Sequence, residues 1–315
     1  MIIMTRSRIA AAARKLKTLL WIAGICSFFL PACRDEGLQG QAAAMAAPSR
    51  GETQRSTADH SARRIDPAGL TVATRFAAPP GFLRVAAAEN SFAHYLRQLP
   101  LKPHQAKVLL YDGRSKENNG IYEAVVDLPI GSKNLHQCAD AVMRLRAEYF
   151  YRQKQFQQIH FNFTNGFRVD YAKWIQGYRV VVTGNQTRWA LRRSPANSDR
   201  DFWEYLEVVF SYAGTLSLAR ELVPVEIADL QIGDVFIQGG APGHAIIVVD
   251  LALHPVRREK MFILAQSYMP AQEIHILCNP DDPEQSPWYG ANFGAVLKTP
   301  EWTFRKTDLK RFPGS

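Results

Sequence analysis

The chain has 315 residues, 47% of them hydrophobic, and is long enough to form at least one domain with a sizeable core. Its 38 Lys and Arg residues against 29 Asp and Glu residues give a formal net charge of +9. No cluster of basic residues interleaved with aromatic residues accompanies this charge, which argues against nucleic-acid binding.

The N-terminal region has the pattern of a targeting segment. Five basic residues precede TLLWIAGICSFFL, an apolar run that is short for a membrane span. LPAC follows at residues 30–33 and resembles the lipobox of bacterial lipoproteins, although proline at residue 31 is unusual there. We therefore expect residues 1–33 to be a lipoprotein signal peptide with lipidation at Cys33. Secretion with cleavage after QAAAMAA is the alternative.

A lipoprotein signal implies a place in the bacterial cell envelope. We expect the mature protein to be held on the membrane through its N-terminal lipid, at the outer membrane and facing the periplasm. Removal of the signal peptide leaves 33 basic and 29 acidic residues, a net charge of +4. Residues 34–80 are rich in small and polar side chains, so we predict a flexible tether there. An arm packed on the domain is the alternative, and residues 81–315 are predicted to form a single α+β domain.

The first half of this domain has one strongly patterned helix. A short helix is predicted after Ser91, and two strands are predicted over residues 107–113 and 120–130. The stretch NLHQCADAVMRLRAEY then predicts an amphipathic helix, with Asn134 as N-cap and Gln137 completing a capping box. Cys138 falls on the buried stripe of this helix.

The second half is predicted to be mostly strands. Residues 161–191 are aromatic-rich and mixed, and residues 199–214 predict a second amphipathic helix that ends at Gly214. Residues 286–304 contain Pro and Gly breaks and are expected to wrap the surface. Strands are predicted over residues 234–240, 244–253, 260–268 and 273–278. The order of these elements predicts an α+β fold with an antiparallel sheet packed on the Cys138 helix.

Three residues have the order and chemistry of a nucleophilic site. Cys138 lies near a helix start, where the helix dipole and a neighbouring imidazole lower a thiol pKa. His244 opens an apolar strand after a glycine-rich loop and is the expected general base. Gln266 ends the next strand and is expected to orient the imidazole. The Cys138 backbone N–H and the Gln137 side chain are expected oxyanion donors.

Other interpretations of these residues remain open. Cys138 is also a candidate for a disulfide with Cys278 or for an inert core thiol. The orienting role of Gln266 has the alternatives Ser267, Gln272 and Glu273. Aromatic residues at the end of the chain are candidates for a groove that binds sugar or peptide: Trp288, Tyr289 and Trp302. The histidines and cysteines lack metal-ligand spacing, so we predict no metal and no cofactor.

The order of these motifs resembles papain-like envelope cysteine amidases and peptidases of the CHAP and NlpC/P60 type. In CHAP domains a glutamine precedes the nucleophile, as Gln137 precedes Cys138, and a Gly-His pair follows a G-D-V strand, as Gly243 and His244 do. The gap of 106 residues between Cys138 and His244 is long for that group, so an inserted helical and aromatic segment is expected.

A closer resemblance covers residues 81–312. The stretches QCADAVMRLRAEY, YAGTLSLARELVPV, GDVFIQGG and LAQSYMPAQEIHIL are similar to a bacterial family catalogued as domain of unknown function 4846, which implies no activity. Two functions follow as hypotheses. The first is a papain-like cysteine amidase or endopeptidase acting on cell-wall peptides or related envelope amides through a thioacyl intermediate. The second is a non-catalytic papain-like binding or scaffold module.

Overall fold

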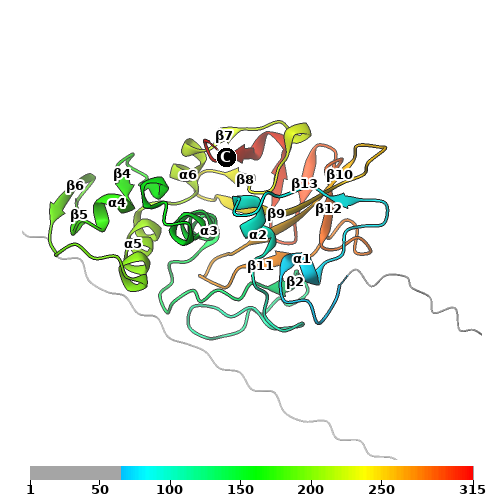
Figure 1. Cartoon of the computed structure of the whole chain (residues 1–315), viewed down its shortest axis with the longest axis horizontal. Coiled ribbons are helices and arrows are strands. Elements are labelled where there is room, and N and C mark those ends of the chain that lie inside the picture. Colours follow the sequence, from blue (N-terminus) through cyan, green and yellow to red (C-terminus); the bar gives the residue numbers. More distant parts are fainter. Residues whose placement is uncertain (1–64, 315) are drawn as a thin grey trace, which may run out of the picture. The chain divides into compact units, whose positions relative to one another are not determined.

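The apolar run that begins at His244 forms β9 (His244–Leu253), a central strand of the largest sheet in the computed structural model, which describes residues 65–314. The main strand order is β2-β11-β10-β9-β8-β15-β7, and β1 and β12 pair with β9 and β10 (Figure 1). All these pairings are antiparallel. The other strands of this sheet are β1 (Leu83–Arg84), β2 (Tyr122–Val125), β7 (Val223–Pro224), β8 (Val235–Gln238), β10 (Lys260–Gln266), β11 (His275–Leu277), β12 (Trp288–Gly290) and β15 (Leu309–Arg311).

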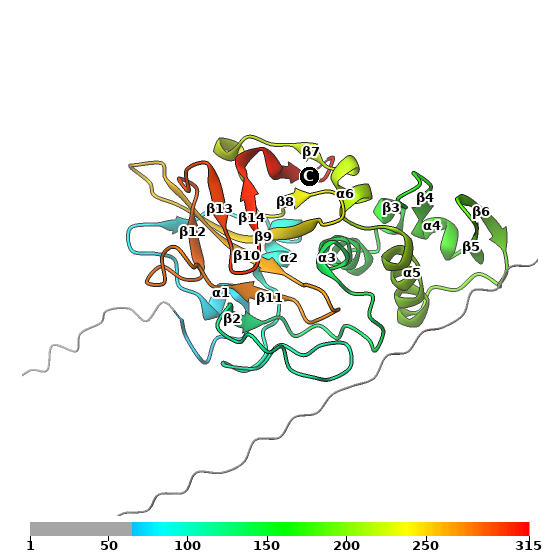
Figure 2. The ribbon, with the colours of Figure 1, turned by 180° about the vertical axis from the view of Figure 1, so that it is seen from behind.

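Both faces of the sheet are covered. On one face, Ile247 and Val249 of β9 belong to the core that includes α3 (Cys138–Arg152) and α2 (Phe92–Arg97). On the other face, Ile246 and Val248 pack in a second core with the hairpin of β13 (Val296–Lys298) and β14 (Thr303–Arg305) (Figure 2). Burial of both faces explains why β9 is continuously apolar instead of alternating.

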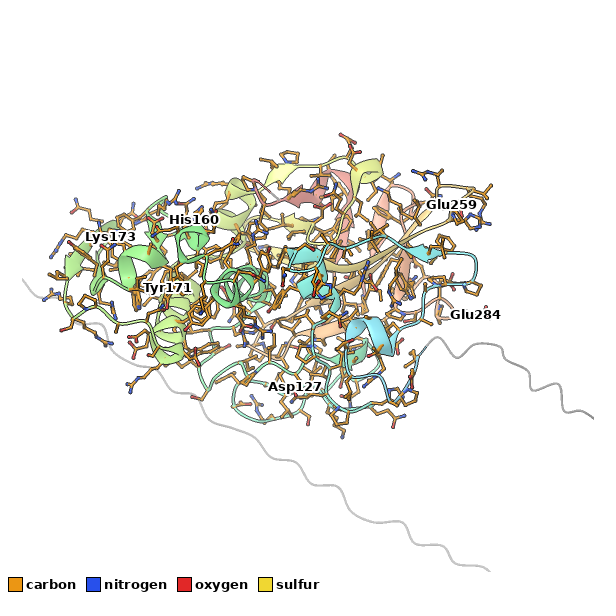
Figure 3. All side chains as sticks on the ribbon, in the orientation of Figure 1. Asp127, His160, Tyr171, Lys173, Glu259 and Glu284 are labelled. Atoms are coloured by element: carbon orange, nitrogen blue, oxygen red, sulfur yellow. The ribbon has the colours of Figure 1, made fainter. Side chains whose placement is uncertain are left out.

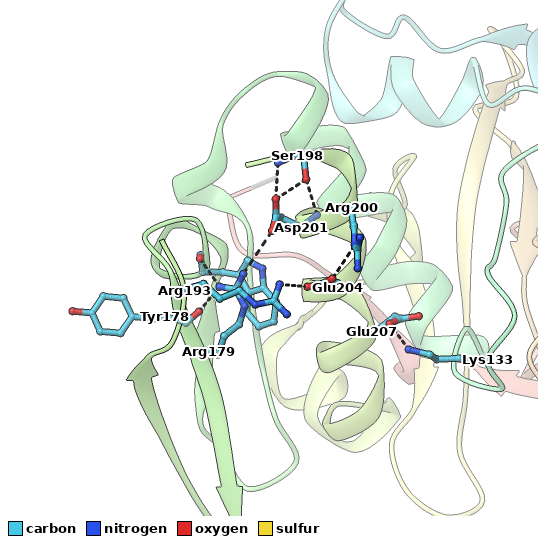
Figure 4. A network of polar contacts seen from close by, with 10 residues as sticks. Lys133, Tyr178, Arg179, Arg193, Ser198, Arg200, Asp201, Glu204 and Glu207 are labelled. Carbon is cyan, nitrogen blue, oxygen red and sulfur yellow. Dashed lines mark hydrogen bonds and ion pairs between the residues drawn. The ribbon is translucent and has the colours of Figure 1, made fainter. Parts of the chain in front are cut away.

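The segment between α3 and β7 forms a separate group of helices and short hairpins. Figure 1 shows α3 lying between this region and the large sheet. Figure 4 shows the charge pairs of α5: Glu204 pairs with Arg193, which precedes the helix, and with Arg200 of the helix itself, and Glu207 pairs with Lys133. The elements are β3 (His160–Asn162), β4 (Arg168–Asp170), α4 (Tyr171–Trp174), β5 (Tyr178–Thr183), β6 (Gln186–Leu191), α5 (Asp199–Tyr212) and α6 (Thr215–Glu221).

The packed part of the chain begins earlier than the sequence indicated. Residues 65–80 were expected in the tether, but they include α1 (Val72–Arg75), and Val72 and Phe76 are fully buried. The Trp288 indole donates to the Ala77 carbonyl at 2.8 Å, so this arm is held against β12. Residues 34–64 of the expected tether, and the expected signal peptide with Cys33, lie outside the described residues.

Three local expectations need correction. Residues 107–113 form no strand, because the chain turns back after Leu110, whose N–H bonds to the Arg114 carbonyl. Residues 286–304 do not wrap the surface, because β12 pairs with β10 and buries Trp288. Gly214 does not end a single helix: α5 stops at Tyr212, and Gly214 is the N-cap of α6.

Candidate functional site

Cys138 is the first residue of α3, and Gln137 is its N-cap, three residues after the N-cap that the capping pattern predicted. The Asp140 carboxylate accepts the Gln137 backbone N–H at 3.0 Å, which caps the helix at this point. The side chain of Asn134, the predicted N-cap, instead accepts the backbone N–H of Ala271 at 2.7 Å. Asn134 thus links the segment that precedes α3 to the β10–β11 connection. It does not cap the helix, which begins at Cys138.

The start of α3 lies against the start of β9. The backbone N–H groups of Ala139 and Ala245 lie close enough to the Cys138 thiol to act against the rise in its pKa, and Ala245 directly follows His244. The thiol therefore lies next to the segment that carries His244. Within residues 65–314, no hydrogen bond joins the Cys138 sulfur to the His244 ring itself.

The imidazole of His244 is held by the end of the neighbouring strand. Gln266 is the last residue of β10, and its side-chain oxygen lies 2.8 Å from His244 Nε2. The Gln266 side-chain nitrogen bonds to Glu301 Oε2 at 2.7 Å and lies 3.2 Å from His275 Nε2. A carboxylate accepts only, so the amide nitrogen must face Glu301 and the amide oxygen must face His244.

This network determines the tautomer of His244. Because Gln266 presents an acceptor, His244 Nε2 carries the proton, and Nδ1 is left with its lone pair. His275 supports the same orientation, since its Nδ1 lies 2.9 Å from the Glu273 carbonyl and its Nε2 can accept from Gln266. The imidazole is also enclosed by aromatic rings, with ring centroids at 4.9 Å from Tyr268 and 5.4 Å from Trp302.

A pocket of about 500 Å³ opens at the start of α3. Its wall includes Gln137, Cys138 and Asp140 together with the glycine-rich loop of residues 240–243 and the start of α6. A Cβ atom at Gly243 would lie 2.5 Å from Thr215 Oγ1 and 2.7 Å from two backbone oxygens. Only glycine lets this loop pack closely beside His244.

Burial sets the protonation states in this site. It raises the pKa of the Cys138 thiol to about 11, with a further contribution from Asp140. It lowers the pKa of His244 to about 4, opposed by the bond to Gln266. The thiol pKa is therefore raised, contrary to the expected lowering, because desolvation outweighs the helix N–H groups. At neutral pH the two groups are a neutral thiol and a neutral imidazole.

The alternative orienting residues are engaged elsewhere. Ser267 donates to the Gln272 carbonyl at 2.7 Å, the Gln272 side-chain nitrogen donates to the Pro270 carbonyl, and Glu273 pairs with Lys102. The side chain of Gln137, the expected oxyanion donor, lines the pocket and donates to Asn134 Oδ1 at 3.3 Å.

The other cysteine and the aromatic residues also have definite places. Cys138 and Cys278 are both free thiols in the described part of the chain, and Cys278 donates to the Gly120 carbonyl. Trp288 and Tyr289 are buried in the two cores. Trp302 does border a cleft, of about 880 Å³, which also includes Glu301.

Sequence reasoning missed the residues that support Gln266. Glu301 lies in a loop with no helix or strand pattern, and Lys116, which pairs with it at 2.8 Å, lies in a polar turn. Asp140 was also missed, although acidic residues are common in the first turn of helices. An acidic residue three positions after Gln137 was the available signal for this cap.

Two features are absent from residues 65–314. These residues contain no group of three or more His, Cys, Asp and Glu side chains arranged to hold a metal ion. None of their helices combines the length and hydrophobicity that a membrane span requires.

The fold is an α+β domain in which Cys138, at the start of α3, lines a pocket, while His244 and Gln266 are hydrogen-bonded to each other at the ends of β9 and β10. Residues 72–311 match the family described as domain of unknown function (4846), and the chain belongs to this family. Comparison with curated proteins and with solved structures found no match.

Proposed function

We propose that this protein is a papain-like cysteine amidase or endopeptidase that cleaves cell-wall peptides or related envelope amides. The observation that carries the proposal is the 2.8 Å bond from His244 to Gln266 at the ends of β9 and β10. It leaves Nδ1 of a fixed imidazole available as a base on the strand whose next residue, Ala245, lies beside Cys138.

The proposed reaction begins from the neutral pair. The Cys138 thiol transfers its proton to His244 Nδ1 as the sulfur attacks the amide carbonyl carbon. The Cys138 backbone N–H and the Gln137 side chain stabilise the oxyanion. Collapse breaks the C–N bond, the leaving amine takes the proton from His244, and a thioester remains. Water, deprotonated by His244, then releases the acid and restores the thiol.

The absence of a direct bond between thiol and imidazole fits a resting site. Catalytic hydrogen bonds in free enzymes are often long and tighten only when substrate binds. Substrate bound in the pocket also excludes water from the Cys138 sulfur. Proton transfer within this proposal therefore takes place in the complex and needs no preformed ion pair.

The same proposal places the enzyme at the bacterial cell envelope. LPAC at residues 30–33 supports anchoring through a lipid on Cys33, at the outer membrane and facing the periplasm. The partners are then a cell-wall peptide or another envelope amide, and the membrane. The reaction as written uses only side chains of this chain and needs no cofactor.

A second candidate is a non-catalytic papain-like binding module. It is favoured by one observation, the burial that raises the pKa of Cys138 to about 11 and lowers that of His244 to about 4. In this alternative the pocket binds an envelope peptide without cleaving it, and Cys138 is an inert thiol.

Digestion of purified peptidoglycan separates the two functions. The mature chain in detergent, Cys138→Ala and the matched control Cys278→Ala are incubated with peptidoglycan, and new amino groups and released fragments are measured by mass spectrometry. Cleavage by the wild type and by Cys278→Ala, with none by Cys138→Ala, is expected. Binding without cleavage by all three proteins, or equal cleavage by all three, would contradict the enzyme.

A further inference from the structure

Arg146 differs from the other buried cations of the described chain. The buried set is Arg75, Arg97, Lys116, Arg144 and Arg146. The first four each bond to a carboxylate or a backbone carbonyl. Only 8% of Arg146 is exposed, and it makes no hydrogen bond or ion pair with any residue between 65 and 314. Its nitrogen atoms are not among the fully enclosed unpartnered atoms, so they face open space. A charge buried without a partner is costly, so this position calls for an explanation.

Aromatic rings surround the guanidinium without neutralising it. Its carbon lies 4.5 Å from the ring centre of Phe150, 4.9 Å from that of Phe92 and 5.1 Å from that of Phe312. Each such contact stabilises a cation by roughly 0.5–2 kcal/mol, but a ring offers no acceptor for its N–H groups. The hydrogen-bonding capacity of Arg146 is thus left unused.

Arg146 lines a hollow at the end of α3. This cavity has a volume of about 280 Å³, and its polar lining comprises Arg146, Gln158, His160, Asn162, Arg168 and Glu221. Figure 3 shows His160 in the segment that follows α3. Arg146 also borders a second hollow, of about 510 Å³, on the side of α2. Its guanidinium is therefore reachable by a small molecule.

The charges of the smaller hollow favour a monoanion. Arg168 is paired with Asp170 at 2.7 Å, so Arg146 is the positive charge without a counter-ion. Burial and the two arginines lower the pKa of His160, which keeps its ring neutral. Burial raises the pKa of Glu221 to about 7, so this carboxyl is partly protonated at neutral pH. A dianion such as phosphate would be opposed by Glu221, whereas a single carboxylate balances Arg146.

We propose that this hollow binds a small organic monocarboxylate, whose oxygens accept bonds from the Arg146 guanidinium. A planar guanidinium matches the geometry of a carboxylate. Phe150 and Phe312 flank the apolar part of the ligand, and Glu221 accepts an N–H from it. The site lies on the lining of a different pocket from Cys138, and its existence does not depend on the proposed enzyme activity.

Thermal unfolding of the full chain at pH 7 tests this site. The probes are N-acetyl-L-alanine, its uncharged N-methylamide and inorganic phosphate, at equal ionic strength. The carboxylate is expected to raise the wild-type midpoint by about 3–6 °C at ten times its Kd, and the uncharged amide is expected to have no effect. A shift of the same size with the amide, or a shift with phosphate alone, would overturn the proposal.

Variants assign the shift to Arg146. Arg146→Met is expected to lose the carboxylate-dependent shift, and Arg146→Lys to weaken the affinity at least fivefold in calorimetric titration. The lysine variant keeps the charge, so it tests the site even where the methionine variant does not fold. Arg188→Met, at an exposed arginine of β6, is the matched control and is expected to keep the full shift. Unchanged affinity in Arg146→Lys would contradict the assignment.

Discussion

Gln266 is fixed with its amide oxygen toward His244, because its amide nitrogen is bonded to the Glu301 carboxylate at 2.7 Å. A glutamine beside a histidine can in general present either its donor or its acceptor. The ion pair of Glu301 with Lys116 removes this freedom. The proposed base, Nδ1 of His244, is thus selected by a residue that does not contact the imidazole.

The first prediction concerns the protonation of His244. We expect its neutral ring to carry the proton on Nε2, and we expect the ring to stay neutral down to about pH 5, because burial lowers its pKa to about 4. Long-range ¹H–¹⁵N NMR of histidine-labelled protein between pH 4 and 8 measures both properties. An Nδ1–H tautomer, or a titration near pH 6.5, would show that the network is arranged differently.

The second prediction concerns Glu301 as a positioning residue. Glu301→Leu leaves Lys116 without its partner and releases Gln266, so we expect a loss of about 1–3 kcal/mol in the free energy of unfolding. We also expect both tautomers of His244 to appear in the NMR spectrum. Urea unfolding measures the stability. Asp281→Leu, which removes an exposed pair with Lys298, is the control and should cost less than about 1 kcal/mol. A normal tautomer in Glu301→Leu would remove the positioning role.

The third prediction concerns Asp140 and pH. Burial raises the pKa of this carboxyl to about 8, so the folded state retains a proton that the unfolded chain releases near pH 4. The contribution of Asp140 to the free energy of unfolding is therefore fully present below pH 4. It is lost as the pH rises towards 8. Asp140→Asn has no carboxyl that titrates in this range, so it does not lose this contribution. The free energy of unfolding of the variant minus that of wild type should therefore increase by up to about 1.4 kcal/mol per pH unit in that range.

A matched control belongs to this experiment. Asp112→Asn changes an exposed aspartate whose pKa is lowered by hydrogen bonds from Arg114. Its titration lies below pH 4, so its effect on unfolding should stay constant between pH 5 and 8. Parallel pH curves for Asp140→Asn and wild type would mean that Asp140 is charged throughout.

The periodicity of apolar residues and the order of the elements were enough to predict the α+β class and the buried stripe of α3. They also predicted the antiparallel strands that carry His244 and Gln266. These elements are local, and their apolar residues recur at helical or strand spacing. The same reasoning placed Cys138 near a helix start. It missed the exact start because the side chain of Asn134 bonds across the fold to Ala271.

The missed features depend on contacts between distant segments. Glu301 reaches Gln266 across 35 residues, and Trp288 reaches Ala77 across 211. No local pattern marks either partner. The raised thiol pKa was missed for a similar reason, since desolvation of Cys138 depends on how completely α3, β9 and α6 enclose it.

The central claim is that His244 acts as the base for Cys138, and alkylation by iodoacetamide between pH 5.5 and 9 tests it most directly. The mature chain and His244→Ala are compared by intact mass and peptide mapping, with Cys278 as internal reference. A neutral base and a neutral thiol coexist between their pKa values of about 4 and about 11, so the Cys138 rate should be nearly independent of pH. It should fall at least tenfold in His244→Ala. A Cys138 rate that rises tenfold per pH unit in both proteins, as expected for an unassisted thiol such as Cys278, would contradict the claim.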